Sequence, residues 1–237
     1  MREIQELLRV CSLRHSHLCP RQVIGVRMAL AGAAALGLEL PQHENLGPPQ
    51  HENLGLPQHE NLGPPRKDKT LLVIAETDGC FVDGLEVAAG VTPGHRTLRI
   101  EDYGKVAATF VNVKSGQALR LAPRPDVRQR ALAYAPGEER HYFAQLQGYQ
   151  VMPEEELFSN TAVILTPAIE QILSRPGAKV CCSACGEEII NEREILFQGM
   201  TYCRSCFGEG YYREVKAVLQ IPIDEEQVLS YSQLLDN

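Results

Sequence analysis

Four cysteines near the C-terminal end of the chain have the spacing of a metal site. They form two Cys-x-x-Cys pairs, which residues 186–202 separate: Cys182 and Cys185, then Cys203 and Cys206. Each pair can direct two thiolates at one ion, and two pairs complete the tetrahedral sulfur shell that zinc prefers. The pattern therefore predicts a zinc ribbon, and its closed four-sulfur shell makes this zinc structural rather than catalytic.

The turns and the hairpin of the predicted ribbon can also be placed. Gly186 and Gly208 follow the two pairs, where glycine suits a tight turn. We expect a hairpin over residues 188–197, between the pairs. Cys181 is an alternative first ligand, although Cys182 has the better spacing. A redox-active Cys-x-x-Cys or a disulfide is the competing interpretation, which the joint occurrence of both pairs disfavours.

A second group of chemically active residues lies near the N-terminus, in the segment His15-Ser-His17-Leu-Cys19-Pro20. If the segment is extended, residues 15, 17 and 19 project to one face, which places two imidazoles and a thiol together. Pro20 suits the first position of a helix, where the helix dipole favours the thiolate of Cys19 as a ligand or a nucleophile. The alternative is that these residues only cap a helix or pack in the core.

Cys80 and Asp83 are the predicted partners of this segment. They follow an apolar stretch, residues 71–75, at a predicted strand-to-helix turn. Sites gather at the carboxyl ends of strands, so these side chains are expected to face His17 and Cys19 across a cleft. A His/Cys/Cys set leaves one coordination position of a metal open, which is typical of a reactive site.

The elements that must position these residues are a mixture of helices and strands. Residues 1–40 have helical patterning with a break at Pro20, and the second of the two helices is apolar on nearly every face, as in a buried helix. Strands are predicted at 71–75, 97–100, 106–113 and 117–121, and helical segments at 82–90, 125–135, 138–147 and 152–156. We therefore predict an α+β fold with a mixed sheet, packed helices and a small C-terminal zinc-ribbon domain.

The predicted domain boundaries follow from these patterns. Residues 1–175 are assigned to the α+β domain, residues 176–210 to the zinc ribbon and residues 211–237 to a tail with a short helix. In residues 41–65 the motif Pro-Gln-His-Glu-Asn-Leu-Gly occurs three times. Such a segment has no apolar face, so we predict a disordered loop. Its histidines could bind a metal, but repeat expansion in a tolerant loop is the favoured interpretation.

The composition disfavours several classes of protein. The chain has 237 residues and a net charge of -7, with 23 Lys and Arg against 30 Asp and Glu, so broad binding to nucleic acid is not expected. The longest apolar run, residues 29–38, is too short to span a bilayer, and we predict no membrane association. The N-terminus lacks the pattern of a secretory signal. We expect a cytoplasmic protein whose thiols stay reduced and available to metals.

An ordered series of motifs resembles the FmdE family, which is named from the molybdenum and tungsten formylmethanofuran dehydrogenase operons. The motifs are His15-x-His17-x-Cys19-Pro20, Gly25-Val26-Arg27-Met28, Glu76-Thr77-x-x-Cys80-x-x-Asp83, Thr92-Pro93-Gly94 and Asp102-Tyr103-Gly104-Lys105-Val106-Ala107-Ala108-Thr109-Phe110. Residues 182–206 are similar to the C-terminal zinc ribbon that many members carry. The resemblance covers about residues 10–160 and 180–207.

The resemblance implies an α+β core, a homodimer and a metal-binding cleft. The core metal residues that it implies are His17, Cys19 and Cys80, with His15 and Asp83 as neighbours and Lys105 as a nearby cation. Zinc is the favoured second metal, although iron, nickel or copper would also suit these donors. The chain departs from the family pattern at Arg21, where glycine is usual, and at Val91, where a further cysteine is expected. The second departure disfavours a mechanism that needs another redox thiol at that position.

Three functions are compatible with these observations. The first is a metal-binding accessory or redox protein of one-carbon or molybdopterin-type metabolism, related to formylmethanofuran dehydrogenase, which would act with an oxidoreductase complex or another protein partner. The second is a module without catalysis, whose ribbon docks on protein or nucleic acid. The third is a thiol enzyme with Cys19 or Cys80 as nucleophile, His17 as base and Lys105 as a further candidate catalytic group.

Overall fold

The computed structural model describes residues 2–13, 17–40, 69–173 and 177–212. The predicted octapeptide loop, His15 and the predicted helix of the C-terminal tail lie outside these residues. The chain divides into two compact units, Met1–Leu173 and Ser174–Asn237. Among the helices in the described ranges, none is long and apolar enough to cross a membrane.

The first unit contains a five-stranded mixed sheet with helices packed on it, which confirms the predicted α+β class. The strands are β1 (Leu71–Ala75), β2 (Leu98–Ile100), β3 (Ala108–Asn112), β4 (Ala118–Pro123) and β5 (Phe158–Val163). Their order in the sheet is β2-β1-β3-β4-β5. β1 pairs with β2 in parallel, and the other neighbouring strands are antiparallel.

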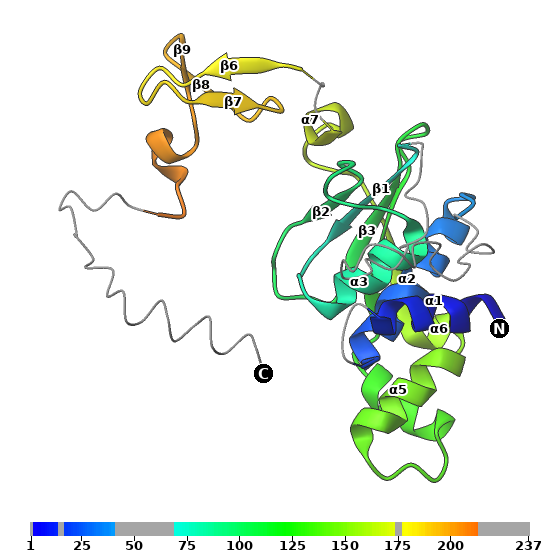
Figure 1. Ribbon diagram of the computed structural model, residues 1–237. Helices are drawn as coiled ribbons and strands as arrows, with labels where there is room; N and C mark the ends of the chain where they lie inside the picture. The colour runs from blue at the N-terminus through cyan, green and yellow to red at the C-terminus, as the bar shows by residue number, and fades with distance from the viewer. Residues whose placement is uncertain (1, 14–16, 41–68, 174–176, 213–237) are drawn as a thin grey trace, which may run out of the picture. The chain divides into compact units, whose positions relative to one another are not determined.

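The helices of this unit differ greatly in length. They are α1 (Arg2–Leu13), α2 (Pro20–Ala35), α3 (Cys80–Ala89), α4 (Val127–Arg130), α5 (His141–Val151), α6 (Glu154–Leu157) and α7 (Ile169–Leu173), with a 3₁₀ helix at Ala131–Tyr134. Figure 1 shows α1, α2 and α3 lying together, and all three contact one another. α2 also contacts β3, β4 and α5, so it lies at the centre of the unit. This position explains why its sequence is apolar on nearly every face.

Both faces of β1 are buried. Leu71, Val73 and Ala75 belong to the main core, which the strands share with α1, α2 and α3. Leu72 belongs to a smaller cluster that includes Ile172 of α7. Because helices cover both faces, the strand is a continuous apolar run rather than an alternating one.

α2 and α3 approach each other closely through two glycines. A Cβ atom on Gly25 would collide with the backbone carbonyl oxygen of Phe81, and one on Gly84 would lie 2.5 Å from the backbone carbonyl oxygen of Gln22. Only glycine lets the two backbones touch in this way. Both glycines lie within the first half of their helices, so their contact also brings the two helix N-termini together.

The second unit contains two small antiparallel hairpins. β6 (Lys179–Cys181) pairs with β7 (Glu188–Ile190), and β8 (Ile195–Phe197) pairs with β9 (Met200–Tyr202). The prediction of one hairpin over residues 188–197 is therefore wrong, because β7 and β8 belong to different hairpins. Asn191 and Glu192, which have positive φ angles of 62° and 54°, form a turn directly after β7, and the chain then continues into β8, which pairs with β9.

Candidate functional site

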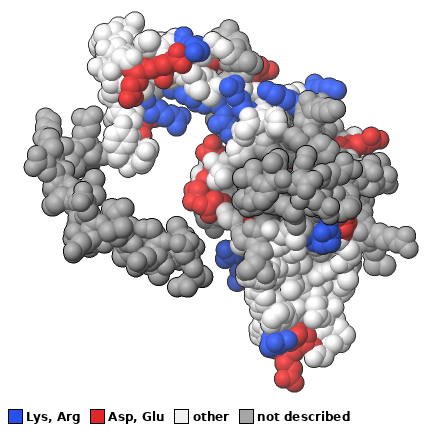
Figure 2. All heavy atoms as spheres, in the orientation of Figure 1, with Lys and Arg blue, Asp and Glu red and all other residues white. Residues whose placement is uncertain are grey.

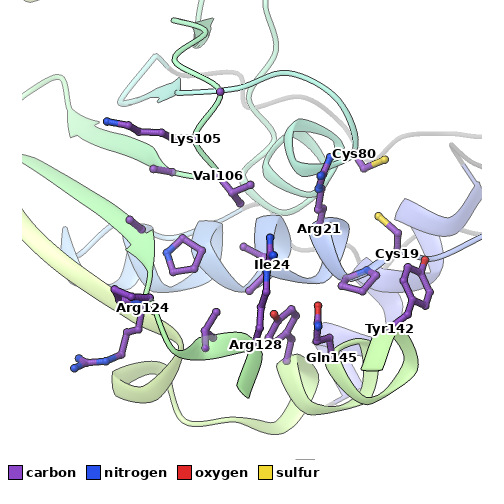
Figure 3. Close-up of a pocket in the computed structure, with 18 of the residues that line it drawn as sticks. Cys19, Arg21, Ile24, Cys80, Lys105, Val106, Arg124, Arg128, Tyr142 and Gln145 are labelled. Atoms are coloured by element: carbon purple, nitrogen blue, oxygen red, sulfur yellow. The ribbon is translucent and has the colours of Figure 1, made fainter. Parts of the chain in front are cut away.

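The structure brings the thiols of Cys19 and Cys80 together, each at the N-terminus of a helix. Cys19 is the N-cap residue of α2, and Cys80 is the first residue of α3. Burial raises the pKa of the Cys80 thiol, and Cys19 raises it further through its charge and as a hydrogen-bond partner. Figure 3 shows the two sulfur atoms facing the same space. This dithiol pair is the candidate site of the first unit.

Gln22 holds the start of α2 in place. Its side-chain oxygen accepts a hydrogen bond from the backbone N–H of Cys19 at 2.9 Å, and its amide nitrogen donates to the carbonyl oxygen of Cys11 at 3.0 Å. The Gln22 side chain is fully buried, so its two hydrogen bonds replace water that cannot reach it. Gln22 was not identified from the sequence because cysteine is not a usual N-cap residue. The N3 residue that follows it was therefore not expected to form a capping hydrogen bond.

Glu76 accepts hydrogen bonds from two cationic residues, Arg120 and Lys105. Its carboxylate accepts two hydrogen bonds from the guanidinium of Arg120, at 2.5 Å and 2.7 Å, and these hold the pKa of Glu76 below its ordinary value. The backbone carbonyl oxygen of Glu76 accepts hydrogen bonds from the N–H groups of Tyr103 and Lys105, at 2.9 Å and 3.1 Å. One residue at the end of β1 therefore positions both Arg120 and Lys105.

Arg27 ties α5 to α2. Its guanidinium donates hydrogen bonds to three backbone carbonyl oxygens at the end of α5, those of Tyr149, Gln150 and Met152, at 2.9, 3.0 and 2.7 Å. A cation is favoured there by the negative end of the helix dipole. Arg27 thus fixes the helix that presents Tyr142 to the dithiol pair.

A cleft of about 850 Å³ opens beside the thiols. Its wall is built from the N-terminus of α2, the β2–β3 connection, the end of β4, α4 and α5. Tyr142 and Gln145 from α5 and Arg128 from α4 are lining residues that sequence reasoning missed. Burial raises the pKa of Tyr142, and the charges of Cys19 and Cys80 raise it further. Figure 3 shows this side chain beside Cys19.

The remaining predicted core-site residues have different positions. His17 and Lys105 line the cleft, and Asp83 is near enough to Cys80 to raise the pKa of its thiol. No group of three potential ligand atoms within 4.8 Å of one another includes Cys19 or Cys80 in the described part of the chain. The predicted three-ligand core site therefore stays a prediction, and its neighbour His15 lies outside the described residues.

The four predicted ribbon cysteines form one compact cluster. The sulfur atoms of Cys182, Cys185, Cys203 and Cys206 all lie within 4.8 Å of one another, and Cys181 is not among them. Hydrogen bonds from the backbone N–H groups of Cys185 and Cys203 lower the pKa of Cys182 to about 6, whereas the neighbouring thiols raise the pKa of Cys206 to about 12. The turns use glycines with positive φ after each pair, as predicted: 77° at Gly186 and 95° at Gly208. Four sulfurs in this arrangement fit a tetrahedral zinc site.

Known proteins share the domain of the first unit. A family profile described as "FmdE, Molybdenum formylmethanofuran dehydrogenase operon" matches residues 14–159. A curated relative from Archaeoglobus fulgidus, named "Probable S-adenosyl-L-methionine-binding protein", is 30% identical over 107 residues, which are 45% of this chain and 24% of the relative. The chain therefore spans about a quarter of the length of that relative.

A solved structure shares the fold. The crystal structure of a tungsten formylmethanofuran dehydrogenase FmdE-like protein from Syntrophus aciditrophicus has a TM-score of 0.50 and 16% sequence identity, covering 89% of this chain and 95% of that chain. The similarity at this identity concerns the fold alone. The family profile, in contrast, covers more than half of the 237 residues, so the chain belongs to the FmdE family.

Proposed function

We propose that the dithiol pair Cys19 and Cys80, together with His17, binds a second metal ion, and that the protein has an accessory or redox role in one-carbon or molybdopterin-type metabolism. The observation that carries this proposal is the meeting of two thiols from two helix N-termini at an open cleft. Soft thiolate and imidazole donors suit zinc and also iron, nickel or copper.

The donor set fits a metal only in part. Cys19 and Cys80 are in place, whereas His17 lines the same cleft without completing a three-atom cluster. A third ligand therefore requires movement of His17, a ligand outside the described residues or a solvent molecule. Such a metal would supply Lewis-acid or redox chemistry to a molecule in the cleft, and the incomplete protein shell would leave a position for that molecule.

The same contact favours metal-free thiol chemistry as a second candidate. Two neighbouring thiols can lose two electrons and two protons to an oxidised acceptor and form a disulfide. The raised pKa of Cys80 opposes this candidate at neutral pH, because the attacking species is the thiolate. A bound cation would instead favour deprotonation of both thiols.

Metal content per chain separates these candidates. We would measure it by elemental mass spectrometry on the wild type, Cys19→Ser, Cys80→Ser and Cys206→Ser, after purification without chelator. Two metals in the wild type are expected, one of which is lost in Cys19→Ser and Cys80→Ser and the other in Cys206→Ser. Cys181→Ser is the matched control, because this exposed thiol is outside the four-sulfur cluster. A single zinc that survives Cys19→Ser would refute the core metal.

Three further parts of the proposal concern the setting of the protein. We propose a cytoplasmic homodimer that acts with an oxidoreductase or another protein partner, and sedimentation analysis tests the dimer. A docking role of the ribbon without catalysis would be supported if Cys19→Ser left all cellular function intact while Cys206→Ser abolished it.

The name of the Archaeoglobus fulgidus relative points to a ligand, S-adenosyl-L-methionine. This molecule has a carboxylate, an ammonium and a sulfonium group, so its net charge is positive. The cleft beside the thiols carries cations, including Arg21 and Arg128, which would repel it. We therefore expect that S-adenosyl-L-methionine does not bind in this cleft. Equilibrium dialysis against the labelled compound tests this expectation.

A further inference from the structure

Several cations line the cleft beside the dithiol pair. In the described part of the chain, no Asp or Glu is among the residues that line it. Four of the cations are Arg21 at the start of α2, Lys105 in the β2–β3 connection, Arg124 after β4 and Arg128 in α4. Arg120 also lines the cleft, but its charge is neutralised by Glu76. Charges of both signs are visible over the surface in Figure 2, so a region with cations alone is a local feature.

These four cations are available to a ligand. Within the described ranges, none of them forms an ion pair with a carboxylate, in contrast to Arg9 and Arg130. Arg124 donates one long hydrogen bond of 3.5 Å to the backbone carbonyl oxygen of Glu155. Two carboxylates sense charges of this group. Glu76 senses Lys105 and is itself paired with Arg120. Asp126 senses Arg124 and is itself paired with Arg130 at 2.6 Å. Guanidinium groups that share a concave surface and have no carboxylate partner there are suited to bind carboxylate or phosphate oxygens.

The size and the apolar walls of the cleft indicate an organic ligand rather than an inorganic ion. About 850 Å³ is within the range of pockets for drug-sized molecules and cofactors. Ile24 and Val106 contribute apolar surface to the cleft. Tyr142, which Figure 3 draws beside Cys19, and Gln145 add polar groups. In the view of Figure 3, Lys105 lies on the side away from the two sulfur atoms. A ligand could therefore meet Lys105 at one end and the thiols at the other.

We propose that this cleft binds a cofactor-sized organic anion that carries at least two phosphate or carboxylate groups. Arg124, Arg128 and Lys105 bind its anionic groups, Arg21 adds charge beside the thiols, and the apolar walls contact its body. The reacting end of the anion lies next to Cys19 and Cys80, and this last part rests on the function proposed above.

Binding of two probe anions to the full-length protein tests the proposal. Pyrophosphate represents a phosphate-bearing ligand and citrate a polycarboxylate, and each is titrated by calorimetry at physiological salt. We expect saturable binding of at least one, and the stronger probe identifies the class of anion. Arg128→Gln should weaken this binding about tenfold, since charge-assisted hydrogen bonds are lost, and Arg124→Gln should act similarly. Arg9→Gln is the matched control, because it removes the same charge from α1, outside the cleft.

Each outcome supports or overturns one part of the proposal. Failure of both probes to bind at millimolar concentration overturns it, and so does equal weakening by Arg9→Gln and Arg128→Gln, which would indicate general charge attraction. Circular dichroism of each variant shows whether it is folded. The metal content of the same wild-type preparation is measured beside the titration. Anion binding without a second metal would refute the proposed function alone, and a second metal without anion binding would refute this inference alone.

Discussion

Gly84→Ala is the substitution that most directly tests how the fold creates the dithiol pair. Gly84 lies in α3 against the backbone of α2, near the N-termini that carry Cys19 and Cys80. If the glycine is there only because the helix tolerates it, alanine should stabilise the protein. If it is there to let two backbones touch, alanine should destabilise the protein and separate the thiols.

The expected magnitude follows from the distances at this contact. A Cβ atom on Gly84 would lie 2.5 Å from the carbonyl oxygen of Gln22 and 2.7 Å from the backbone nitrogen of Val26, whereas ordinary contacts begin at 3.4 Å. The helices must therefore separate by about 0.9 Å, the difference between 3.4 and 2.5 Å. Overpacking against a rigid backbone costs about 3 kcal/mol, and the higher helix propensity of alanine offsets about 1 kcal/mol. We expect the free energy of unfolding to fall by about 2 kcal/mol.

Two assays are needed, because stability and thiol geometry are separate consequences. Urea denaturation followed by the helical circular dichroism signal gives the free energy of unfolding. In metal-free protein, peptide mapping by mass spectrometry after mild oxidation gives the rate at which Cys19 and Cys80 form a disulfide, separately from the ribbon thiols, and this rate should be slower in Gly84→Ala. Ala34→Gly, at an exposed position of α2, is the control and should cost up to about 1 kcal/mol without changing that rate. A variant more stable than the wild type, or one that oxidises equally fast, would refute the reasoning.

Three other substitutions test the supports of the two sites. The hydrogen bond from Arg120 lowers the pKa of Glu76 in the folded protein. The contribution of the Glu76–Arg120 pair to stability is therefore complete above the ordinary pKa of 4.5 and is lost as the pH falls through the lower pKa of the folded state. Glu76→Gln should therefore be less stable at neutral pH and lose less stability on acidification, as urea denaturation over a pH series can check. Arg27→Lys should lower the free energy of unfolding by about 2 kcal/mol, because an ammonium cannot reach all three carbonyl oxygens, and denaturation at neutral pH measures the loss. Cys182→Ser should lose the ribbon zinc and Cys181→Ser should keep it in elemental analysis, since only Cys182 belongs to the cluster. Zinc loss in both variants would contradict this ligand assignment.

The elements that the sequence predicts correctly are those with a strong local pattern. β1 is predicted with its observed bounds, because a strand buried on both faces is a continuous apolar run between polar segments. β5 is not predicted, because four of its six residues are exposed at the edge of the sheet and three of these are polar, so that neither an apolar run nor an alternation is visible. α7 is also not predicted, because only one of its five residues, Ile172, is buried and the sequence therefore shows no apolar periodicity.

The candidate site shows the same division between local and distant information. The ribbon ligands can be predicted because each Cys-x-x-Cys pair brings two sulfurs together within a single turn. The sequence predicts that Cys19 and Cys80 share a cleft, but it does not predict the rest of the lining, since the wall combines α2, α4 and α5, and the shape of the cleft depends on Gly25, Gly84 and Arg27. Of these three residues, the two glycines have no side chain to signal a contact. Their role becomes visible only when the crossing of the helices is known.

This difference also determines which cluster of thiols keeps its arrangement in metal-free protein. In the described part of the second unit only Cys182 and Ile189 are buried, so the ribbon has almost no hydrophobic core apart from its thiols. Small units of this kind obtain much of their folding free energy from the metal itself. The first unit has a large apolar core, and the contact between its helices places Cys19 and Cys80 whether or not a metal is bound. A chelator should therefore unfold the ribbon while the helical signal of the first unit persists. In the chelated protein, Cys19 and Cys80 should react with thiol reagents at a rate that differs from the rate of the four ribbon thiols. Unfolding of both units by chelator would mean that a metal, rather than the packing of α2 on α3, holds the two thiols together.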